Sequence, residues 1–226
     1  MAALLIPAVG MARSAAQKAT CLSNLRQIGM GIMAYTDDWS GTLPASRRLL
    51  ANGDELTWDS HHVAEALYQT SESIRVELNW AQMGGKSRGV FRCPSSGSNM
   101  VIFHASSEYG LNGVIAPDVN WRSGYRYGEE RCANIDGLRR KSELYLAADT
   151  ASHRTIDGVE RLTTTTGFGP AGFIRASGGT QTYGLHGRHS GGVNMLYCDL
   201  HVAYLARSDV RVGSGVSRNQ APWSEH

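Results

Sequence analysis

The 226-residue sequence lacks two of the short motifs that mark common enzyme families. It has no P-loop and no HExxH motif, so the usual signatures of P-loop phosphate binding and of zinc peptidases are missing. None of the four cysteines forms a CxxC pair, which argues against a zinc knuckle. The sequence therefore carries no signature of a P-loop protein, a zinc peptidase or a zinc knuckle.

A strong net charge is also missing. Lysine and arginine number 22 and aspartate and glutamate 20, which leaves +2, and no basic run is longer than Arg139-Arg140-Lys141. Binding through phosphate neutralisation needs more basic surface, so we expect no nucleic acid among the partners. The 26 glycines suit many turns and short strands, and the length suits one sizeable domain or a compact domain with a long appendage.

Long hydrophobic runs are absent as well. Residues 1–12 are uncharged and mostly apolar, and Arg13 ends this run. Twelve residues cannot span a bilayer, because a membrane helix needs about 20. No basic segment precedes the run, so a complete signal peptide is a poor fit. Pro7 has no amide donor and is expected to kink or locally open a helix here.

A helical pattern follows this run. One apolar stripe recurs at steps of four, three, four and three residues: Cys21, Leu25, Ile28, Ile32 and Tyr35. Polar residues such as Asn24 are expected on the other faces, and residues 37–41 (Asp-Asp-Trp-Ser-Gly) read as a helix stop and turn. A helix from about Ala2 to Tyr35 would be about 50 Å long. That exceeds the width of a small domain, so we expect part of the helix to project.

The C-terminal part predicts a β-hairpin, with strands at residues 193–197 and 201–205 and a two-residue turn at Asp199-Leu200. The pairs that follow are Tyr197 with Val202, Met195 with Tyr204 and Val193 with Ala206. Their apolar side is expected to pack on the core against the helix stripe, with Cys198 and His201 on the opposite side. A tight turn favours glycine at the second position, so Leu200 predicts a strained or different turn.

The middle of the chain predicts short elements. Residues 61–69 read as a helix, 90–93 as a strand that runs into a Cys93-Pro94 turn, 109–113 as a turn-rich segment, and 142–149 as a buried strand that ends in an acid.

Ligand-type residues gather near the hairpin and leave three interpretations open. The structural one, which we favour, has Asp199 capping the turn and His189 hydrogen-bonded to its loop. A metal site would use His186, His189, Asp199 and His201. A catalytic His–Asp pair is the third, although no well-placed nucleophile or second acid accompanies it. We expect no cofactor and no metal.

Several of these landmarks together resemble one family. They are Ile6-Pro7-Ala8, Arg13, Cys21, the Asn24–Gly29 run, Cys93-Pro94-Ser95, Tyr109-Gly110-Leu111-Asn112-Gly113, and His189 and Asp199 with nine residues between them. The chain resembles type IV pilin-like (pseudopilin) proteins of the prepilin-type H-X9-DG family. It departs from them at Leu200, and in lacking the processing site, the N-terminal Phe and the Glu of the mature family protein. Met1 is expected to begin near the C-terminal end of the family's membrane segment.

The resemblance implies an α+β fold, with a long N-terminal helix (residues 1–37) packed on a small antiparallel head (residues 38–226). It implies a structural subunit of a type IV pilus-like filament or a type II secretion-type pseudopilus, not an enzyme. The implied partners are copies of itself, the inner membrane before assembly and the assembly machinery. The implied location is the bacterial cell envelope, in an extracellular or periplasmic filament. The apolar residues expected to bring helices together are Leu4, Leu5, Ile6, Pro7, Val9 and Met11.

Two other functions remain open. One is an adhesin-like minor pilin that binds a surface through Trp121, Tyr125 and Tyr127 together with a Gly/Thr-rich loop. The other, less favoured, is a metal-dependent enzyme centred on the C-terminal histidines.

The cysteines allow further expectations. An even number permits two disulfides with three connectivities, and four free thiols are the alternative for a cytosolic protein. Cys21 lies on the helix stripe that should face the head and Cys93 begins a turn, so a Cys21–Cys93 bridge would tether the helix to the head. Cys132–Cys198 is the second pairing. Such bridges require an oxidising compartment, in agreement with an exported pilin-like protein.

Overall fold

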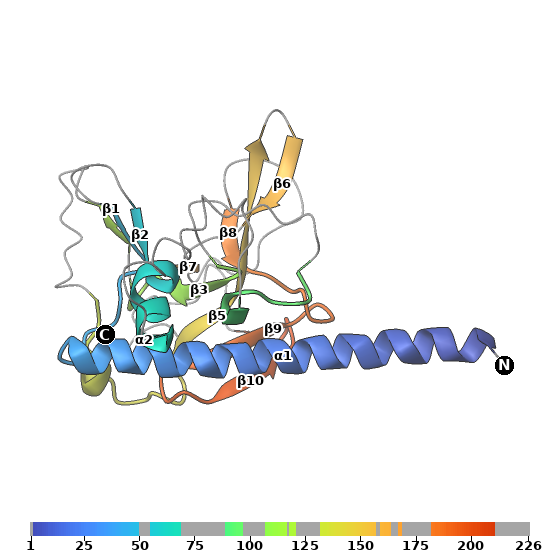
Figure 1. Cartoon of the computed structure of the whole chain (residues 1–226), viewed down its shortest axis with the longest axis horizontal. Coiled ribbons are helices and arrows are strands. Elements are labelled where there is room, and N and C mark those ends of the chain that lie inside the picture. The colour runs from blue at the N-terminus through green and yellow to red at the C-terminus, as the bar shows by residue number, and fades with distance from the viewer. Residues whose placement is uncertain are drawn as a thin grey trace.

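The computed structural model describes residues 2–49, 55–68, 89–96, 107–116, 118–120, 132–156, 159–163, 167–168 and 182–210. A long N-terminal helix lies along one side of a head of strands and short helices, and its N-terminal part extends beyond the head (Figure 1). The predicted α+β class, with a long helix on a small and largely antiparallel sheet, is confirmed.

The helix α1 (Ala2–Asp38) has 37 residues and is about 55 Å long at 1.5 Å per residue. It runs through Pro7 without interruption, so the expected local opening is absent (Figure 1). Proline at this position removes only one helical hydrogen bond, and that loss falls near the helix end. The helix ends where Ser40 and Gly41 adopt positive φ angles of 52° and 81° and the Gly41 N–H donates to the Thr36 carbonyl at 2.7 Å.

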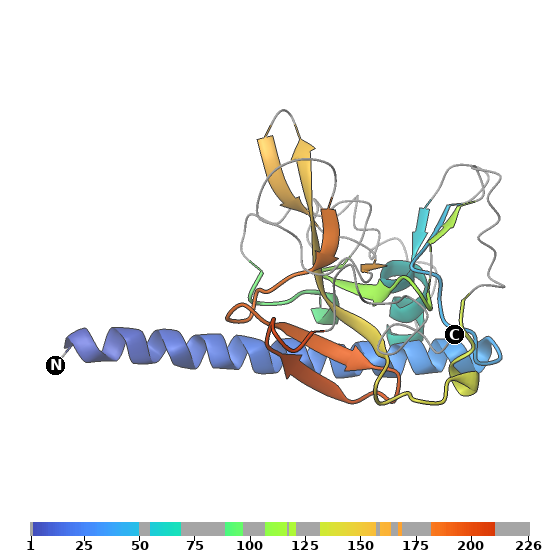
Figure 2. The same cartoon turned by 180° about the vertical axis from the view of Figure 1, so that it is seen from behind.

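The larger sheet is built around one long strand, β5. Among the described residues this sheet has seven strands: β3 (Tyr109–Asn112), β5 (Tyr145–Ile156), β6 (Val159–Thr163), β7 (Gly167–Phe168), β8 (Thr182–Leu185), β9 (Val193–Tyr197) and β10 (Val202–Leu205). Their order is β10-β9-β5-β3-β7, and β6 and β8 also pair with β5. All pairs are antiparallel except β3 with β7. The first half of β5 therefore joins the hairpin to β3, and its second half carries β6 and β8 (Figure 2).

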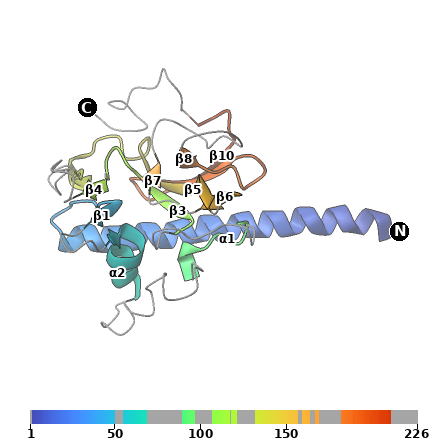
Figure 3. The same ribbon diagram turned by 90° about the horizontal axis from the view of Figure 1, so that it is seen from above.

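A smaller sheet and several helical segments lie near the C-terminal half of α1. The sheet has the order β2-β1-β4, from β1 (Arg47–Leu49), β2 (Glu55–Thr57) and β4 (Asp118–Asn120). The helical segments are the π-helical η1 (Trp58–Val63), α2 (Ala64–Tyr68), and the 3-10 segments η2 (Gly89–Phe91) and η4 (Ile135–Gly137). Seen from above, α2 lies beside α1 on the side opposite β8 and β10 (Figure 3).

The main core forms around the helix stripe. Cys21, Leu25, Ile28 and Ile32 have no exposed surface, and Tyr35 is 8% exposed. The first four pack with buried residues of the head that include Trp58, Phe91, Tyr109, Leu111, Leu146 and Leu196. Gly31 allows α2 to approach, because a Cβ at this position would lie 2.6 Å from side-chain atoms of Val63 and Leu67. The docking of α1 thus depends on a buried apolar stripe and on the absence of a side chain at Gly31.

The hairpin has a different register from the predicted one. Val202 lies opposite Leu196 and Leu205 opposite Val193, one residue away from the pairing inferred from a two-residue turn. The three predicted pairs (Tyr197 with Val202, Met195 with Tyr204, Val193 with Ala206) were therefore wrong. The Leu200 N–H donates to the Tyr197 carbonyl at 2.9 Å, and Leu200 has a φ of 70°. Residues 198–200 form a three-residue loop, whose last residue takes the left-handed conformation.

The shifted register also exchanges the two faces of the hairpin. Leu196 contacts α1 beside Gly29, and Cys198 belongs to the core around the helix stripe. Val193, Met195 and Tyr197 pack in a separate apolar cluster with Tyr145, Ala148, Leu185 and Val210. The His201 ring stacks on Tyr197 with centroids 4.0 Å apart, so the expectation that it shares a side with Cys198 was wrong. A one-residue slip changes the face of every side chain in a strand.

Three predictions for the middle also change. Residues 90–93 do not form a strand, because the 3-10 segment η2 ends at Phe91. The turn-rich segment at 109–113 is strand β3 through Asn112, which pairs with β5. The helix expected at 61–69 begins earlier, with η1 at Trp58, and α2 continues it to Tyr68, while Gln69 lies outside the described residues.

Candidate functional site

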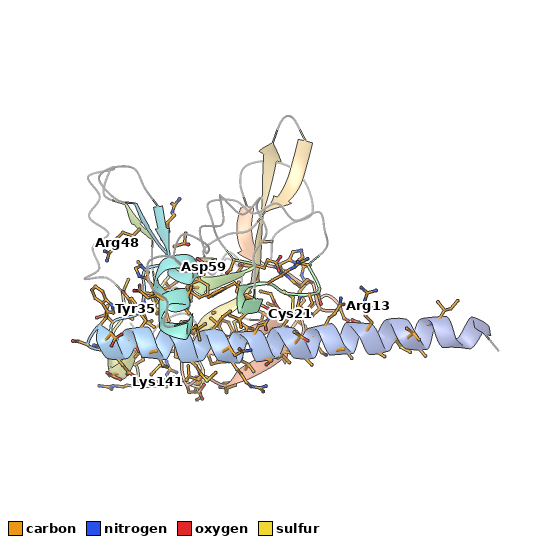
Figure 4. All side chains as sticks on the ribbon, viewed as in Figure 1. Arg13, Cys21, Tyr35, Arg48, Asp59 and Lys141 are labelled. Atoms are coloured by element: carbon orange, nitrogen blue, oxygen red, sulfur yellow. A yellow bond between two sulfur atoms is a disulfide. The ribbon has the colours of Figure 1, made fainter. Side chains whose placement is uncertain are left out.

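The first part of α1 projects away from the head as an apolar arm, defined here as residues 2–16. Every side chain from 6 to 16 is exposed, and Ile6, Val9 and Met11 are 76%, 65% and 69% exposed. Pro7 also lies on this arm, and the side chains of Leu4 and Leu5 are outside the described part of the chain. Figure 4 shows Arg13 near the point where the arm leaves the head. A continuous exposed apolar surface is typical of a site that binds another surface.

Among the described residues, no helix combines the length and the hydrophobicity needed to cross a bilayer.

Contact with the head begins directly after the arm, at Gln17. The Gln17 side chain donates to the Pro94 carbonyl at 2.9 Å, and the Lys18 ammonium lies 4.4 Å from the Tyr204 ring centroid. We call residues 17–38 the docked half of α1. Asn24 belongs to it: its side chain is 8% exposed and donates to the Arg92 carbonyl at 2.8 Å. The prediction that Asn24 lies on another face was therefore wrong.

A disulfide joins the docked half to the head. Cys21 and Cys93 are bonded across 72 residues of sequence, with a Cα–Cα distance of 5.3 Å, and Figure 4 shows Cys21 at the underside of the head. Cys132 and Cys198 are buried and form no disulfide, so the second predicted pairing was wrong. Cys132 lines a cavity beside Tyr35 and Trp39 near the end of α1, whereas Cys198 lies in the hairpin loop.

Ionisable side chains surround this disulfide in the interior. Nε2 of His189 lies 3.4 Å from Sγ of Cys93 and 3.3 Å from Oδ2 of Asp149. Asp149 is fully buried and His189 is 2% exposed. We call Cys21, Cys93, Asp149 and His189 the disulfide cluster. It places an imidazole in contact with both a sulfur atom and a carboxylate.

A buried ion pair lies next to the cluster. Oε2 of Glu108 accepts a hydrogen bond from the Cys93 N–H at 2.5 Å and lies 3.8 Å from Nη1 of Arg188. Arg188 also donates to the Thr150 carbonyl. Burial, together with the Asp149 carboxylate, raises the pKa of the nearby Tyr109 hydroxyl well above its usual value. The interior beside the disulfide is therefore polar and closely interconnected.

Two local features position His189 and Asp149. Ser190 and Gly191 have φ angles of 53° and 84°, as in a type I′ turn, and the Gly192 N–H donates to the His189 carbonyl at 3.0 Å. This tight turn precedes β9 and directs the His189 ring inward. Asp149 lies within β5, where its Oδ2 accepts the Asn194 N–H at 2.7 Å. The cluster is thus fixed by the sheet and by a turn that needs glycine.

The two residues of the H-X9-D spacing lie at opposite ends of β9. Asp199 is exposed in the hairpin loop, where its Oδ1 accepts the His201 N–H at 3.1 Å and lies 2.6 Å from His201 Nδ1. The His186 ring accepts from Arg188 Nε at 3.1 Å. The structure therefore brings Asp199 and His201 together but separates them from His189, and the four residues considered for a metal site do not meet.

The acids and the arginine of this interior were not predicted from the sequence as site residues. Asp149 was visible as an acid at the end of an apolar strand, which is an unusual place for an unpartnered charge. Glu108 and Arg188 had no comparable signal, because they contact each other across 80 residues of sequence. Trp121, Tyr125 and Tyr127, named for a surface-binding function, lie outside the described residues.

The fold and the projecting helix define a pilin-like α+β protein. A family model described as "Protein of unknown function (DUF1559)" matches residues 10–167, well over half of the chain, and the chain belongs to this family. Membership is compatible with a pilin-like surface protein. No curated protein and no solved structure matches the chain.

Proposed function

We propose that this chain is a prepilin-type H-X9-DG subunit that assembles through α1 into a type IV pilus-like filament or a type II secretion-type pseudopilus. Its role is structural and requires no catalysis and no cofactor. Its partners are copies of itself, the inner membrane before assembly and the assembly machinery, with no nucleic acid. The filament lies in the bacterial cell envelope, in the periplasm or outside the cell.

The observation that carries the proposal is the exposed arm. Ile6, Val9 and Met11 keep more than half of their surface in contact with water, although the same helix buries its stripe completely from Cys21 onward. Exposed apolar surface of this kind is stabilised by contact with another apolar surface. The alanines at 2, 3, 8, 12, 15 and 16 allow neighbouring helices to approach closely. Packing of arms from several copies would satisfy both features.

The disulfide supports export. Structural disulfides persist in oxidising compartments and are rare in the cytosol. The Cys21–Cys93 bond fixes the docked half to the head, so a force applied along the arm would be transmitted to the head through a covalent link.

Assembly of the purified 226-residue chain tests the proposal. We expect sedimentation velocity to show association that increases with concentration, and negative-stain electron microscopy to show regular polymers. Val9→Asp combined with Ile6→Asp places charges on the arm, where burial between helices would be costly, and should abolish the polymers.

Met30→Asp is the matched control, because Met30 is an exposed apolar residue of the same helix (57% exposed) but belongs to the docked half. This variant should assemble like the wild-type chain. A wild-type chain that stays monomeric at high concentration, or an arm variant that still polymerises, contradicts the proposal.

A further inference from the structure

The disulfide cluster contains four potential metal ligands from four distant parts of the sequence. One ligand atom from each of Cys21, Cys93, Asp149 and His189 lies within 4.8 Å of all the others, and all four residues are buried. Thiolate, imidazole and carboxylate are the ligands that zinc uses in proteins. A tetrahedral zinc site with bonds of about 2.0 to 2.3 Å places its ligand atoms about 3.3 to 3.8 Å apart. The His189 Nε2 separations, 3.4 Å from Cys93 Sγ and 3.3 Å from Asp149 Oδ2, already have this spacing.

A second observation concerns the free oxygen of the carboxylate. Oδ2 of Asp149 accepts the Asn194 N–H, but Oδ1 is buried and has no hydrogen-bond partner among the described residues. Leaving a buried carboxylate oxygen unpaired is unfavourable, and such an atom points to a ligand or to a functional role. This carboxylate belongs to the same cluster as the two sulfur atoms and the imidazole.

We propose that, when the Cys21–Cys93 bond is reduced, the chain binds one zinc ion through Cys21, Cys93, His189 and Asp149. Disulfide and zinc are alternatives at this position, because the sulfur atoms cannot be bonded to each other and to the metal. Reduction by a phosphine consumes one water and gives two thiols and a phosphine oxide. Zinc then replaces both thiol protons, which are released to solvent. A two-electron oxidant returns the disulfide and releases the ion.

The charge of the cluster suits a divalent cation. Two thiolates and one carboxylate carry three negative charges, the neutral imidazole carries none, and zinc leaves a net charge of −1. The Arg188–Glu108 pair beside it is neutral overall.

Such a site would keep α1 attached to the head in both redox states. Cys21 is the ligand on the helix, and the other three belong to the head. A newly made chain in a reducing compartment would hold its helix through zinc, and an exported chain would hold it through the disulfide. This consequence is independent of filament assembly.

Metal binding by the full chain tests the proposal. The chain is reduced with a phosphine under anaerobic conditions and titrated with Zn²⁺ and, separately, with Co²⁺ as a spectroscopic probe. We expect one zinc ion per reduced chain, almost none per oxidised chain, and a cobalt spectrum with thiolate charge-transfer and intense tetrahedral bands. An azo oxidant should release one zinc ion for each disulfide formed, as read by a chromogenic indicator.

Ligand variants locate the site. His189→Gln and Asp149→Asn should weaken zinc binding by more than about 100-fold, which exceeds the usual effect of changing a residue that only supports a ligand. His186→Gln and His201→Gln are the matched controls and should bind zinc like the wild-type chain. Far-UV circular dichroism checks the folding of each variant. If a variant does not fold, the cobalt spectrum of the wild-type chain tests instead whether thiolates bind the metal in a tetrahedral site.

Three results would overturn the proposal. One is a reduced wild-type chain that binds no zinc, whether or not it stays folded, because zinc binding would itself stabilise the folded site. Another is zinc binding that His189→Gln and Asp149→Asn leave unchanged, which would mean that neither residue is a ligand. The third is an octahedral cobalt spectrum without thiolate bands.

Discussion

The two halves of α1 share one continuous helix but have opposite surroundings. In the docked half, Leu25, Ile28 and Ile32 have no exposed surface, and in the arm Ile6 and Val9 are mostly exposed. Hydrophobicity alone does not separate them, because both halves are rich in apolar residues. The docked half differs in having specific attachments: a disulfide, the side chain of Asn24 and the close approach of α2 at Gly31. The position of a helix in this fold therefore depends on these attachments as well as on its apolar residues.

Removing the disulfide is expected to have the largest effect on stability. The disulfide links residues 72 positions apart and so restricts the unfolded chain, which contributes about 4 kcal/mol to the free energy of unfolding. The Cys21→Ala/Cys93→Ala variant should lose this contribution. Urea unfolding followed by circular dichroism measures the difference. Cys198→Ala is the control, since this buried cysteine forms no disulfide, and should cost about 1 kcal/mol. A double variant that loses less than its control would show that the bond does not hold the docked half.

Shortening a buried residue of the stripe should have the next largest effect. Ile28→Ala removes a fully buried side chain between α1 and the head and should lower the free energy of unfolding by about 3 kcal/mol. Met30→Ala, two residues away and 57% exposed, should change it by less than about 0.5 kcal/mol. Equal effects at the two positions would mean that the helix does not dock by this face.

The end of the docked half should be sensitive to alkaline pH. Burial raises the pKa of the Cys132 thiol to about 11, with Arg48 opposing part of this shift. The folded chain therefore keeps a proton that the unfolded chain loses near pH 9, so stability is present below pH 9 and declines as the pH rises to about 11. The loss should be on the order of 2 kcal/mol. Urea unfolding between pH 8 and 11 measures it, and Cys132→Ala should flatten this part of the profile. An identical profile in the variant would assign the decline to other groups.

The parts of the fold that were predictable are those with a local period. The stripe from Cys21 to Tyr35 repeats with the helical period, and β9 is a continuous run suited to a strand, so both appear in the sequence. The register of the hairpin was not predictable in the same way. Leu200 adopts a left-handed conformation that sequence preference assigns to glycine. The hairpin therefore has a three-residue loop where a two-residue turn was predicted.

The interior around the disulfide was less predictable, because tertiary contacts assemble it. Cys93, Glu108, Asp149 and His189 come from separate segments, and no spacing rule links them. The short segment at Tyr109 shows the same effect: its sequence reads as a turn, but pairing with β5 makes it a strand. Local sequence preference sets the secondary structure where no tertiary contact opposes it. In the segment at Tyr109, long-range strand pairing overrides that preference.

The smallest effect on stability is expected in the arm, and it distinguishes the arm from the docked half most directly. Val9→Ala shortens an apolar residue of the same helix as Ile28→Ala, but Val9 is 65% exposed and lies beyond the contacts that begin at Gln17. The free energy of unfolding of the monomer, measured at low concentration, should change by less than about 0.5 kcal/mol. At high concentration the same variant should lose stability relative to the wild-type chain, because association stabilises the folded state by mass action and this variant associates less. A loss of stability at low concentration would instead mean that the arm folds back on its own head.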